Sequence, residues 1–409
     1  MSKNMNVPKL RFKEFDGEWE EKKLKTISVK IGSGSTPRGG EQVYKTSGIP
    51  FIRSQNVNHN KLIFNDVTYI DEKIHNSMRN STVKANDILL NITGASIGRS
   101  CVVPKDFKEG NVNQHVCIIR LKDNYEPSFL QSFLSSFNGQ KLIYQGQTGS
   151  GREGINFQSI GAFKLNLPSK QEQEKIASFL TSVDTKIEQL TKKEELLQQY
   201  KKGVMQKIFS QEIRFKADDG SEFCDWEEKK LGDLLNECKE KSTMNNQFDV
   251  LSSTKDSVVL QSEYFNREIA SSDNTGYKIL RVNQLVFSPQ NLWLGNINVN
   301  TKYEVGIVSP SYKIYDFKNN FLVQYAKYFI KIPRMMYEYG QASEQGASVV
   351  RRSLNIELFN SILISLPSVE EQTKIANFLS SIDSKIEQVQ KQLNSTKEFK
   401  KALLQQMFV

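Results

Sequence analysis

Apolar residues recur with alternating spacings of four and three residues in two long segments of the chain. This heptad pattern indicates a helix with one apolar seam, and such a seam needs a partner helix. We therefore predict long helices within residues 167–211 and 366–409. The predicted seam residues are Ile176, Leu180, Val183, Ile187, Leu190, Ile375, Leu379, Ile382, Ile386 and Val389.

Each predicted helix begins with the same signal, a Leu-Pro-Ser sequence with a glutamate three residues after the serine. The serine can cap the helix, and the glutamate side chain can reach back to the backbone N–H of the serine, as in a capping box. The two pairs are Ser169 with Glu172 and Ser368 with Glu371.

The simplest partner for each seam is the other seam of the same chain, packed antiparallel. The alternative is that each helix pairs with a helix of another protein or of a second copy of this chain. We expect the internal pairing, because the chain supplies two matching seams.

The helices belong to a larger internal duplication. Residues 167–189 and 366–388 lie 199 positions apart and are identical at 16 of 23 positions. The leaders that begin at Leu10 and Ile213 are also related, since each contains Arg-Phe-Lys and then Trp-Glu-Glu-Lys-Lys-Leu. Such a repeat indicates two half-molecules built on one plan. We divide the chain into a leader with a variable domain (1–166), a central helix (167–211), a second leader with a variable domain (212–365) and a C-terminal helix (366–409).

The two variable stretches contain short apolar runs between Gly, Asn, Asp and Pro, which is typical of strands. DILLNITG, HVCIIRL, QLVFSP and SILISLP are examples, whereas PSFLQSFLSSF and LVQYAKYFI predict short helices. The expected fold is therefore α+β, with two globular domains that contain twisted sheets. Two long helices that form an antiparallel coiled coil are expected to separate these domains, with a pseudo-twofold internal repeat.

Several loops of the variable stretches combine small hydroxyl or amide residues with basic residues. Arg, Asn and Gln can make paired hydrogen bonds to base edges, while Ser, Thr and Lys can hold phosphates, so these loops are candidates for contact with duplex DNA. A purely structural role stays open for each residue, because the same composition is common in ordinary loops. The candidates are Ser33, Thr36, Arg38, Arg53, Gln55, Asn56, Thr93, Ser96, Arg99, Asn113, Gln114, Arg152, Ser253, Thr254, Lys255, Gln290, Asn291, Trp293, Ser309, Ser311, Arg351 and Arg352.

One pair of candidates is itself duplicated. Arg152 and Asn156 recur as Arg351 and Asn355 in the register of the repeat. For this pair we favour a structural or phosphate-positioning role over sequence recognition, because the two variable domains otherwise differ in sequence.

The composition is that of an ordinary soluble globular protein, with 38% hydrophobic residues, 25% charged residues and a net charge of +9. The excess of basic residues favours a polyanionic partner, but this signal is weak on its own. The start of the sequence has no apolar export signal, and no segment approaches the roughly 18 apolar residues of a membrane span, so we expect a cytoplasmic protein. The four cysteines lack the spacing of a zinc site and are expected to be reduced.

The sequence contains no motif of a catalytic site. It has no GxxxxGK loop for ATP and no glycine-rich turn followed by the tetrapeptide that an amino-methyltransferase needs. The three histidines, His59, His75 and His115, are dispersed, and we expect His115 to pack or to face DNA rather than to act as a base. We therefore expect no catalytic residues and no metal site.

The two Trp-Glu-Glu-Lys-Lys-Leu leaders and the two LPS-x3-Q-x-KIA-x-FL-x-S-x-D-x-KIEQ helices resemble those of the specificity subunit of bacterial type I restriction-modification systems. The resemblance covers essentially the whole chain, and IRSQNV and ILLNITGASIGRS are similar to parts of the family's target-recognition domains. It implies a non-catalytic subunit that binds double-stranded DNA, in which each target-recognition domain reads one half of a bipartite asymmetric site. It also implies that the coiled coil sets the half-site spacing.

The same resemblance implies the partners. Two methyltransferase subunits would dock on the coiled coil, and two restriction subunits could join them. The chain would have no cofactor of its own, because the partner subunits would use S-adenosylmethionine, ATP and magnesium.

Two other classes of protein stay open at this point. A stand-alone DNA-binding or architectural protein could use the same two domains, and co-purification of a methyltransferase would distinguish a specificity subunit from it. A nuclease would need a metal-binding acidic cluster, and it would show metal-dependent cleavage by the chain alone.

Overall fold

The protein folds into two compact units, each of which combines sheets and helices, so the expected α+β class is confirmed. The computed structural model describes residues 6–58, 60–148, 154–264, 273–345 and 352–409. The first unit combines Met1–Lys193 with Val389–Val409, and the second unit is Glu194–Gln388. Each unit thus contains one variable stretch together with a part of each long helix.

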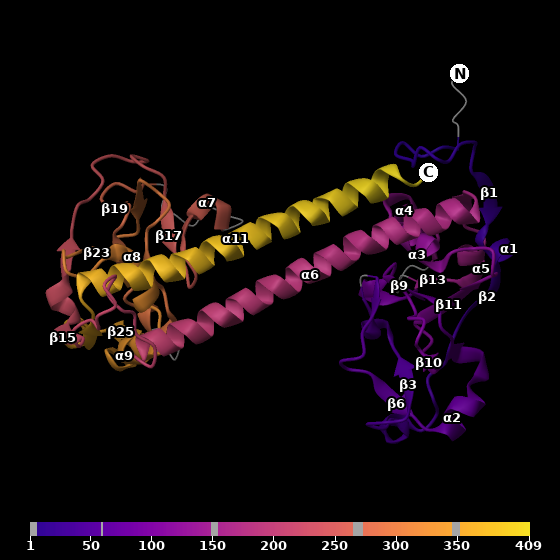
Figure 1. Cartoon of the computed structure of the whole chain (residues 1–409), viewed down its shortest axis with the longest axis horizontal. Coiled ribbons are helices and arrows are strands. Elements are labelled where there is room, and N and C mark those ends of the chain that lie inside the picture. The colour runs from indigo at the N-terminus through magenta and orange to yellow at the C-terminus, as the bar shows by residue number, and fades with distance from the viewer. Residues whose placement is uncertain (1–5, 59, 149–153, 265–272, 346–351) are drawn as a thin grey trace. The chain divides into compact units, whose positions relative to one another are not determined.

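The first unit carries its variable stretch before the long helix α6 (Figure 1). Its strands are β1 (Glu20–Lys23), β2 (Ser28–Ser33), β3 (Ile49–Ile52), β4 (Val57–Asn58), β5 (Lys61–Leu62), β6 (Thr68–Ile70), β7 (Thr82–Val83), β8 (Ile88–Asn91), β9 (Ser100–Val102), β10 (Gly110–Val112), β11 (Val116–Leu121), β12 (Gln147–Thr148), β13 (Gly154–Ile155) and β14 (Lys164–Leu167). Its short helices are α1 (Leu24–Ile27), α2 (Glu72–Ser77), α3 (Pro127–Ser135), α4 (Phe137–Gln145) and α5 (Phe157–Gly161).

The second unit repeats this order of elements in part, ahead of the long helix α11. Its strands are β15 (Glu227–Lys230), β16 (Leu235–Cys238), β17 (Leu251–Ser253), β18 (Val258–Leu260), β19 (Lys278–Arg281), β20 (Leu285–Phe287), β21 (Ile297–Val299), β22 (Val305–Val308), β23 (Lys313–Phe317), β24 (Ser343–Gln345), β25 (Arg352–Leu354) and β26 (Leu363–Leu366). Its short helices are α7 (Gln261–Tyr264), α8 (Val323–Phe329), α9 (Pro333–Gln341) and α10 (Ile356–Ser361).

Both units are built around a four-stranded antiparallel sheet with equivalent connections. Its order is β2-β11-β8-β9 in the first unit and β16-β23-β20-β21 in the second. The remaining strands differ, since the first unit adds a mixed sheet, β6-β3-β10-β7, in which β3 and β10 are parallel. The described part of the second unit has the antiparallel pairs β17–β18 and β19–β22 instead. The repeat therefore keeps one sheet as a common scaffold and varies what is attached to it.

A two-stranded ribbon ties the start of each variable stretch to its end. β1 pairs with β14, and β15 pairs with β26, both antiparallel. Both leaders contribute the same four residues, Glu-Glu-Lys-Lys, and in both ribbons the first of them lies opposite the leucine of Leu-Pro-Ser. This ribbon explains why the leader and the start of the long helix are duplicated together.

The two predicted long helices are α6 (Lys170–Phe209) and α11 (Val369–Gln406). In the first unit, Ile176 near the start of α6 shares a hydrophobic core with Met407, which follows the last turn of α11. The two helix segments are therefore antiparallel within this unit, as expected from the paired seams. All ten predicted seam residues are buried except Ile187, which is half-buried.

Matching ion pairs link the helices in each unit. Lys400 of α11 pairs with Asp184 of α6 in the first unit, and Lys201 of α6 pairs with Asp383 of α11 at 2.5 Å in the second. The two lysines are 199 residues apart, as are the two aspartates. The helix pairing within each unit therefore repeats with the sequence.

The serine caps of both long helices are present, but the second half of the predicted capping box is wrong. The hydroxyl oxygens of Ser169 and Ser368 accept hydrogen bonds from the backbone N–H groups of Glu172 and Glu371, at 3.3 and 3.2 Å. The glutamate side chains do not return to the serines, because a leader arginine binds both oxygens of each carboxylate. A charged fork of two donors is a stronger partner for a carboxylate than a single backbone N–H.

These two ion pairs hold the leaders on the helices. Arg11 donates two hydrogen bonds of 2.8 Å to Glu172, and Arg214 donates bonds of 3.2 and 2.8 Å to Glu371. Both glutamates are buried, and each arginine also donates to backbone carbonyl groups of its own leader. The Arg-Phe-Lys repeat that the sequence displays is therefore part of the scaffold.

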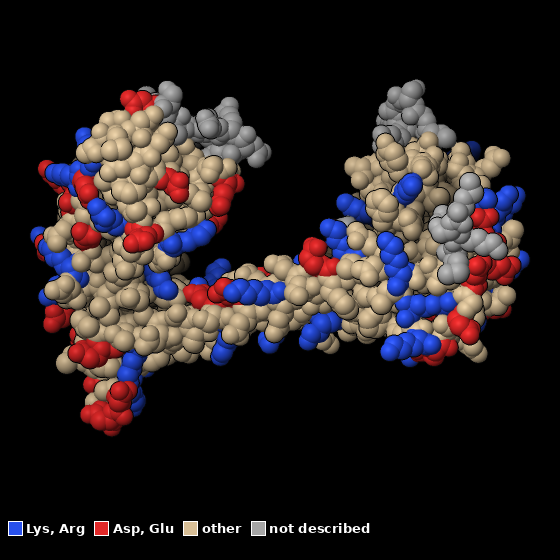
Figure 2. Space-filling view, turned by 90° about the horizontal axis from the view of Figure 1, so that it is seen from above, with Lys and Arg blue, Asp and Glu red and all other residues tan. Residues whose placement is uncertain are grey.

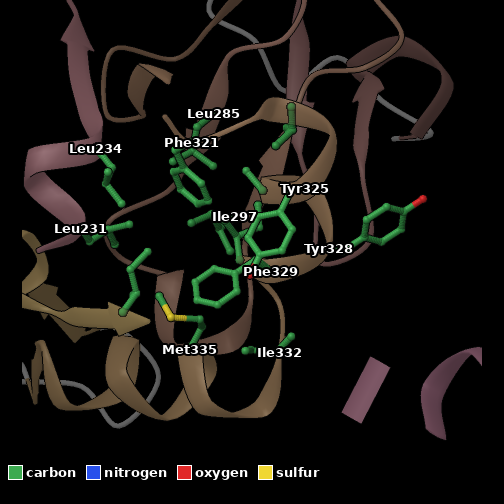
Figure 3. Close-up of a cluster of buried hydrophobic side chains, with 14 of the residues drawn as sticks. Leu231, Leu234, Leu285, Ile297, Phe321, Tyr325, Tyr328, Phe329, Ile332 and Met335 are labelled. Atoms are coloured by element: carbon green, nitrogen blue, oxygen red, sulfur yellow. The ribbon is translucent and has the colours of Figure 1, made fainter. Parts of the chain in front are cut away.

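An aromatic core joins the end of one long helix to each domain. Figure 3 shows this core in the second unit, where Phe321, Tyr325 and Phe329 lie among aliphatic side chains. The ring of Phe209, in the last turn of α6, lies 5.7 Å from the rings of both Tyr325 and Phe329. Phe408, 199 residues later in the repeat, makes the same kind of contact in the first unit, 5.3 Å from Phe129.

Candidate nucleic-acid interface

The candidate loops of the first unit come together at one edge of its sheets. This edge lies where β2 and β8 end and where β11 begins, since Ser33 is paired with Cys117 and Asn91 with Val116. Backbone bonds then join neighbouring loops: Gly34 N–H to Asn113 O, Asn113 N–H to Ile52 O, and Ile92 N–H to His115 O. The structure thus brings the segments that contain Ser33–Arg38, Arg53–Asn56, Thr93–Arg99 and Asn113–Gln114 to one place.

A chain of polar side chains crosses this edge. Thr36 Oγ1 lies 2.6 Å from Gln114 Oε1, Gln114 Nε2 lies 3.1 Å from His115 Nε2, and His115 Nδ1 lies 2.6 Å from Thr93 Oγ1. Thr36 and Gln114 are exposed, whereas Thr93 and His115 are half-buried. Thr36 and Gln114 are therefore exposed to solvent, and the half-buried His115 contacts the amide of Gln114.

The arginine-rich candidates of the first unit lie beside this chain. Arg53 and Gln55 both donate to the carbonyl oxygen of Asp66, at 3.3 and 3.4 Å. Arg38 and Arg99 are exposed. Arg152 lies outside the described residues.

Other candidates of the first unit make hydrogen bonds that stabilise the loops themselves. Asn56 is buried, and its amide accepts from Arg53 N–H at 2.9 Å and donates to Ile63 O at 3.0 Å. Asn113 is buried as well, and its side chain accepts from His115 N–H. Ser96 is half-buried and accepts from Asn91 Nδ2, while half-buried Ser33 donates to Gly34 O. Asn56 and Asn113 therefore stabilise the loops through hydrogen bonds, and their side chains are not exposed for contact with a ligand.

The second unit divides its candidates between two places. Ser253 is the last residue of β17, and Thr254 and Lys255 begin the turn between β17 and β18. The hydroxyl of Tyr312 donates to Ser253 O at 3.4 Å. The turn that contains Ser309 and Ser311 is therefore next to the β17–β18 turn, and the two serine hydroxyls lie 3.1 Å apart. Ser253 is buried, so its hydroxyl is not available at the surface.

The other place in the second unit is the loop that follows β20. The guanidinium carbon of Arg352 lies 4.4 Å from the ring centre of Trp293, a cation–π contact. Gln290 and Asn291 belong to the same loop, and Gln290 is exposed. Arg351 lies outside the described residues. Asn355, the duplicated partner of Asn156, caps α10 just as Asn156 caps α5, so these two asparagines have the structural role that the repeat favoured.

Charge alone does not locate an interface. Figure 2 shows Lys and Arg on the visible face of both units, with Asp and Glu among them. Several basic residues are already paired within the units, among them Arg120 with Asp87 at 2.7 Å and Arg281 with Glu240 at 2.9 Å. The position of the loops on the sheet edge is therefore the stronger guide.

A family model described as "Type I restriction modification DNA specificity domain" matches the chain twice, at residues 16–198 and 224–397. The chain belongs to this type I restriction-modification DNA specificity family. Both matches end at the same position of the internal repeat, since residues 198 and 397 are 199 apart. Each matched segment contains one variable stretch and most of one long helix.

One curated relative matches nearly the whole chain, and another matches about a third of it. The chain is 24% identical to a protein of Methanocaldococcus jannaschii whose name assigns it to a type I restriction enzyme as the MjaX specificity subunit, with 98% of this chain and 95% of the relative covered. It is 33% identical over 132 residues to the EcoBI specificity subunit of Escherichia coli, which covers 32% of this chain and 27% of that protein. The crystal structure of the type I S subunit from M. genitalium has the same fold, with a TM-score of 0.57 at 16% identity and coverage of 98% and 99%.

Among the residues that the structure describes, no group of His, Cys, Asp and Glu side chains could hold a metal ion, and no helix is long and apolar enough to cross a membrane. All four cysteines are free, and burial raises the pKa of Cys101 and Cys117 to about 12.

Lys331, which the sequence did not single out, fixes the turn between β17 and β18. Its ammonium group donates to Lys255 O at 2.8 Å, to Asp256 O at 3.2 Å and to Asn298 Oδ1 at 2.6 Å. Burial lowers the pKa of Lys331 to about 8, which still leaves it mostly protonated at neutral pH. Nothing in the local sequence marks this lysine, because its partners are more than thirty residues away.

We expect Lys331→Met to loosen this turn. The substitution removes the charged donor of three acceptors, of which Asn298 Oδ1 belongs to a buried residue, and this costs about 1–3 kcal/mol of unfolding free energy. Backbone amides of residues 254–258 are expected to exchange hydrogen at least tenfold faster, as measured by mass spectrometry. Lys241→Met, at an exposed lysine of the same unit, is the control. Equal exchange in both variants would mean that Lys331 does not hold the turn.

Proposed function

We propose that this protein is the DNA-reading subunit of a type I restriction-modification complex, and that each unit reads one half of a bipartite asymmetric target. One observation carries the proposal: the same four-stranded sheet presents different polar loops in the two units. A repeated scaffold with unlike surfaces is what recognition of two different half-sites requires. Membership in the specificity family supports the same function.

The exposed candidates have the chemistry of base and phosphate contacts. Arg38, Arg99, Gln114 and Gln290 are exposed, and arginine and glutamine can bind guanine or adenine edges through two hydrogen bonds. Lys255 and the hydroxyl groups of the turns can bind phosphates, which position a protein on the duplex without reading its sequence. We propose these exposed residues, rather than the buried members of the same loops, as the contacts.

We further propose that the long helices dock two methyltransferase subunits. Tyr200 of α6 and Phe399 of α11 are 53% and 51% exposed, and they occupy the same position of the repeat, 199 residues apart. Exposed aromatic side chains are enriched at protein interfaces. Two equivalent aromatic positions fit two copies of one partner.

The chemistry of the complex would then reside in other chains. We propose that this subunit has no catalytic residues and binds no cofactor of its own, whereas the methyltransferase subunits use S-adenosylmethionine. Two restriction subunits, with ATP and magnesium, would complete a complex that also cuts DNA. This division of labour agrees with the lack of catalytic motifs in the sequence.

Exchange of one variable stretch tests the proposal. Residues 231–362 are replaced by the corresponding region of another specificity subunit, and the variant is produced in cells with the cognate methyltransferase. Single-molecule sequencing of methylated adenines is expected to show a split target in which one half has changed and the other half has not. Replacement of residues 24–163 is the matched control and is expected to change the other half.

Two results would contradict the proposal. A change in both halves after a single exchange would mean that the units do not read separately. If no methyltransferase co-purified with the folded chain and the chain alone bound DNA, a stand-alone DNA-binding protein would be favoured.

A further inference from the structure

The polar chain from Thr36 to Thr93 holds the side-chain amide of Gln114 between two neighbours. Nε2 of Gln114 faces Nε2 of His115 at 3.1 Å. An amide nitrogen can only donate, so in this orientation of the amide the histidine nitrogen accepts, and the ring proton is on Nδ1. Nδ1–H then donates to Thr93 Oγ1 at 2.6 Å.

The same amide is held at its other end. Thr36 Oγ1–H donates to Gln114 Oε1 at 2.6 Å. The oxygen and the nitrogen of the Gln114 amide therefore each have one neighbour. A half-turn of the amide would reverse the direction of the whole chain, because the two threonine hydroxyls and the imidazole can each donate or accept. In either orientation, Thr36 and His115 hold the amide of Gln114 in one position.

The amide retains one free position at each end. A carbonyl oxygen has two lone pairs and an NH2 group has two hydrogens, and the chain uses one of each. Gln114 is exposed, so the remaining lone pair and N–H can be offered to a ligand. A donor beside an acceptor matches N7 and N6–H2 of adenine in the major groove.

We propose that Gln114 reads an adenine in the half-site of the first unit, and that His115 is the residue that positions its amide. This inference rests on the proposed function and names one base contact within it. His115 acts through Gln114 and is a positioning residue, because its two ring nitrogens are engaged by Gln114 and Thr93. A glutamine held in one orientation loses less side-chain freedom on binding than a free one.

The second unit has different chemistry at the equivalent place. The turn before β23, which corresponds to the turn before β11, contains Ser309, Pro310 and Ser311 and no amide side chain. This turn of the second unit therefore has no counterpart of the Gln114 contact. This difference is consistent with an asymmetric target.

Two substitutions of one histidine provide the test. In His115→Gln the longer amide keeps an acceptor near the position of Nε2, so Gln114 stays oriented. In His115→Asn the shorter amide keeps the donor near Nδ1 and the bond to Thr93, but it does not reach Gln114. A purely structural role of His115 predicts no such split between the two variants.

The readout is the methylated target in cells that contain the cognate methyltransferase and the full chain. We expect Gln114→Ala and His115→Asn to lower the preference for adenine at one base pair by roughly 10-fold to 100-fold, with all other positions of the target unchanged. His115→Gln is expected to keep the wild-type preference. The exchange of residues 231–362 identifies which half of the target belongs to the first unit.

Other outcomes overturn the inference. An unchanged target with Gln114→Ala means that Gln114 does not read a base. A uniform loss of methylation at all sites, or equal behaviour of His115→Gln and His115→Asn, means that His115 is only structural. Absence of any split methylated target with the wild-type chain would instead contradict the proposed function.

Discussion

Replacement of Glu371 by alanine is expected to lower the free energy of unfolding of the second unit by about 3 kcal/mol. Its side chain is fully buried and accepts hydrogen bonds from Arg214 and from the indole N–H of Trp226 at 3.0 Å. Alanine would leave both donors without their carboxylate. We place the loss at the lower end of the range for a broken buried ion pair, because Arg214 retains 21% of its side-chain exposure to water.

Urea unfolding, followed by tryptophan fluorescence, measures this loss, because Trp226 and Trp293 report on the second unit and Trp19 reports on the first. The first unit offers a matched comparison, since Glu172→Ala breaks the ion pair with Arg11, whereas the tryptophan of that leader makes no hydrogen bond to Glu172. Trp19 there is buried and has no partner for its indole N–H among the described residues. We expect Glu172→Ala to cost about 1 kcal/mol less. Glu370→Ala, at an exposed glutamate next to Glu371, is the control, and a comparable loss in that variant would contradict the assignment.

The second large effect concerns the spacing of the two half-sites. Insertion of seven residues after Glu194 in α6 and after Leu393 in α11 adds one heptad to each helix at equivalent positions of the repeat. Seven residues lengthen a helix by about 10 Å and keep the apolar seam in register. If the helix pair sets the spacing, the methylated target should acquire about three additional base pairs between its halves, since duplex DNA rises by about 3.4 Å per base pair.

Sequencing of methylated adenines reports this spacing directly. A four-residue insertion near Glu194 in α6 alone is the contrasting variant, because it shifts the seam of one helix against the other. That variant is expected to alter the spacing or to disrupt the pairing. An unchanged target spacing in a stable double-insertion variant would show that the helices do not set it.

The repeated parts of the sequence predicted the scaffold well, for a physical reason. Heptad spacing and the Leu-Pro-Ser signal act within one helix, so α6 and α11 and their serine caps could be recognised locally. Contacts between residues that are distant in sequence could not be recognised in this way. Glu172 has the position of a capping-box residue, but its partner Arg11 is 161 residues away and binds the carboxylate more strongly than the cap does.

The sequence identified loops that gather at one sheet edge of the first unit, but it did not show which of their side chains are exposed. Loops rich in Asn, Ser and Arg do gather at one sheet edge of the first unit, yet Asn56 and Asn113 from these loops are buried. A buried loop backbone needs hydrogen-bond partners, and short amides supply them as readily as they bind bases. Residue type is the same in both roles, so only the fold separates Gln114 from Asn113.

The two Glu-Glu-Lys-Lys ribbons have a consequence for how such genes can change. Both ribbons pair the same four residues in the same register with the strand that leads to Leu-Pro-Ser. Recombination between two related genes within the DNA that encodes these ribbons would insert a foreign variable segment. The two ends of that segment would pair in the same ribbon as before. New target specificities could then arise by recombination in a single event, without a series of point mutations that would each have to preserve folding.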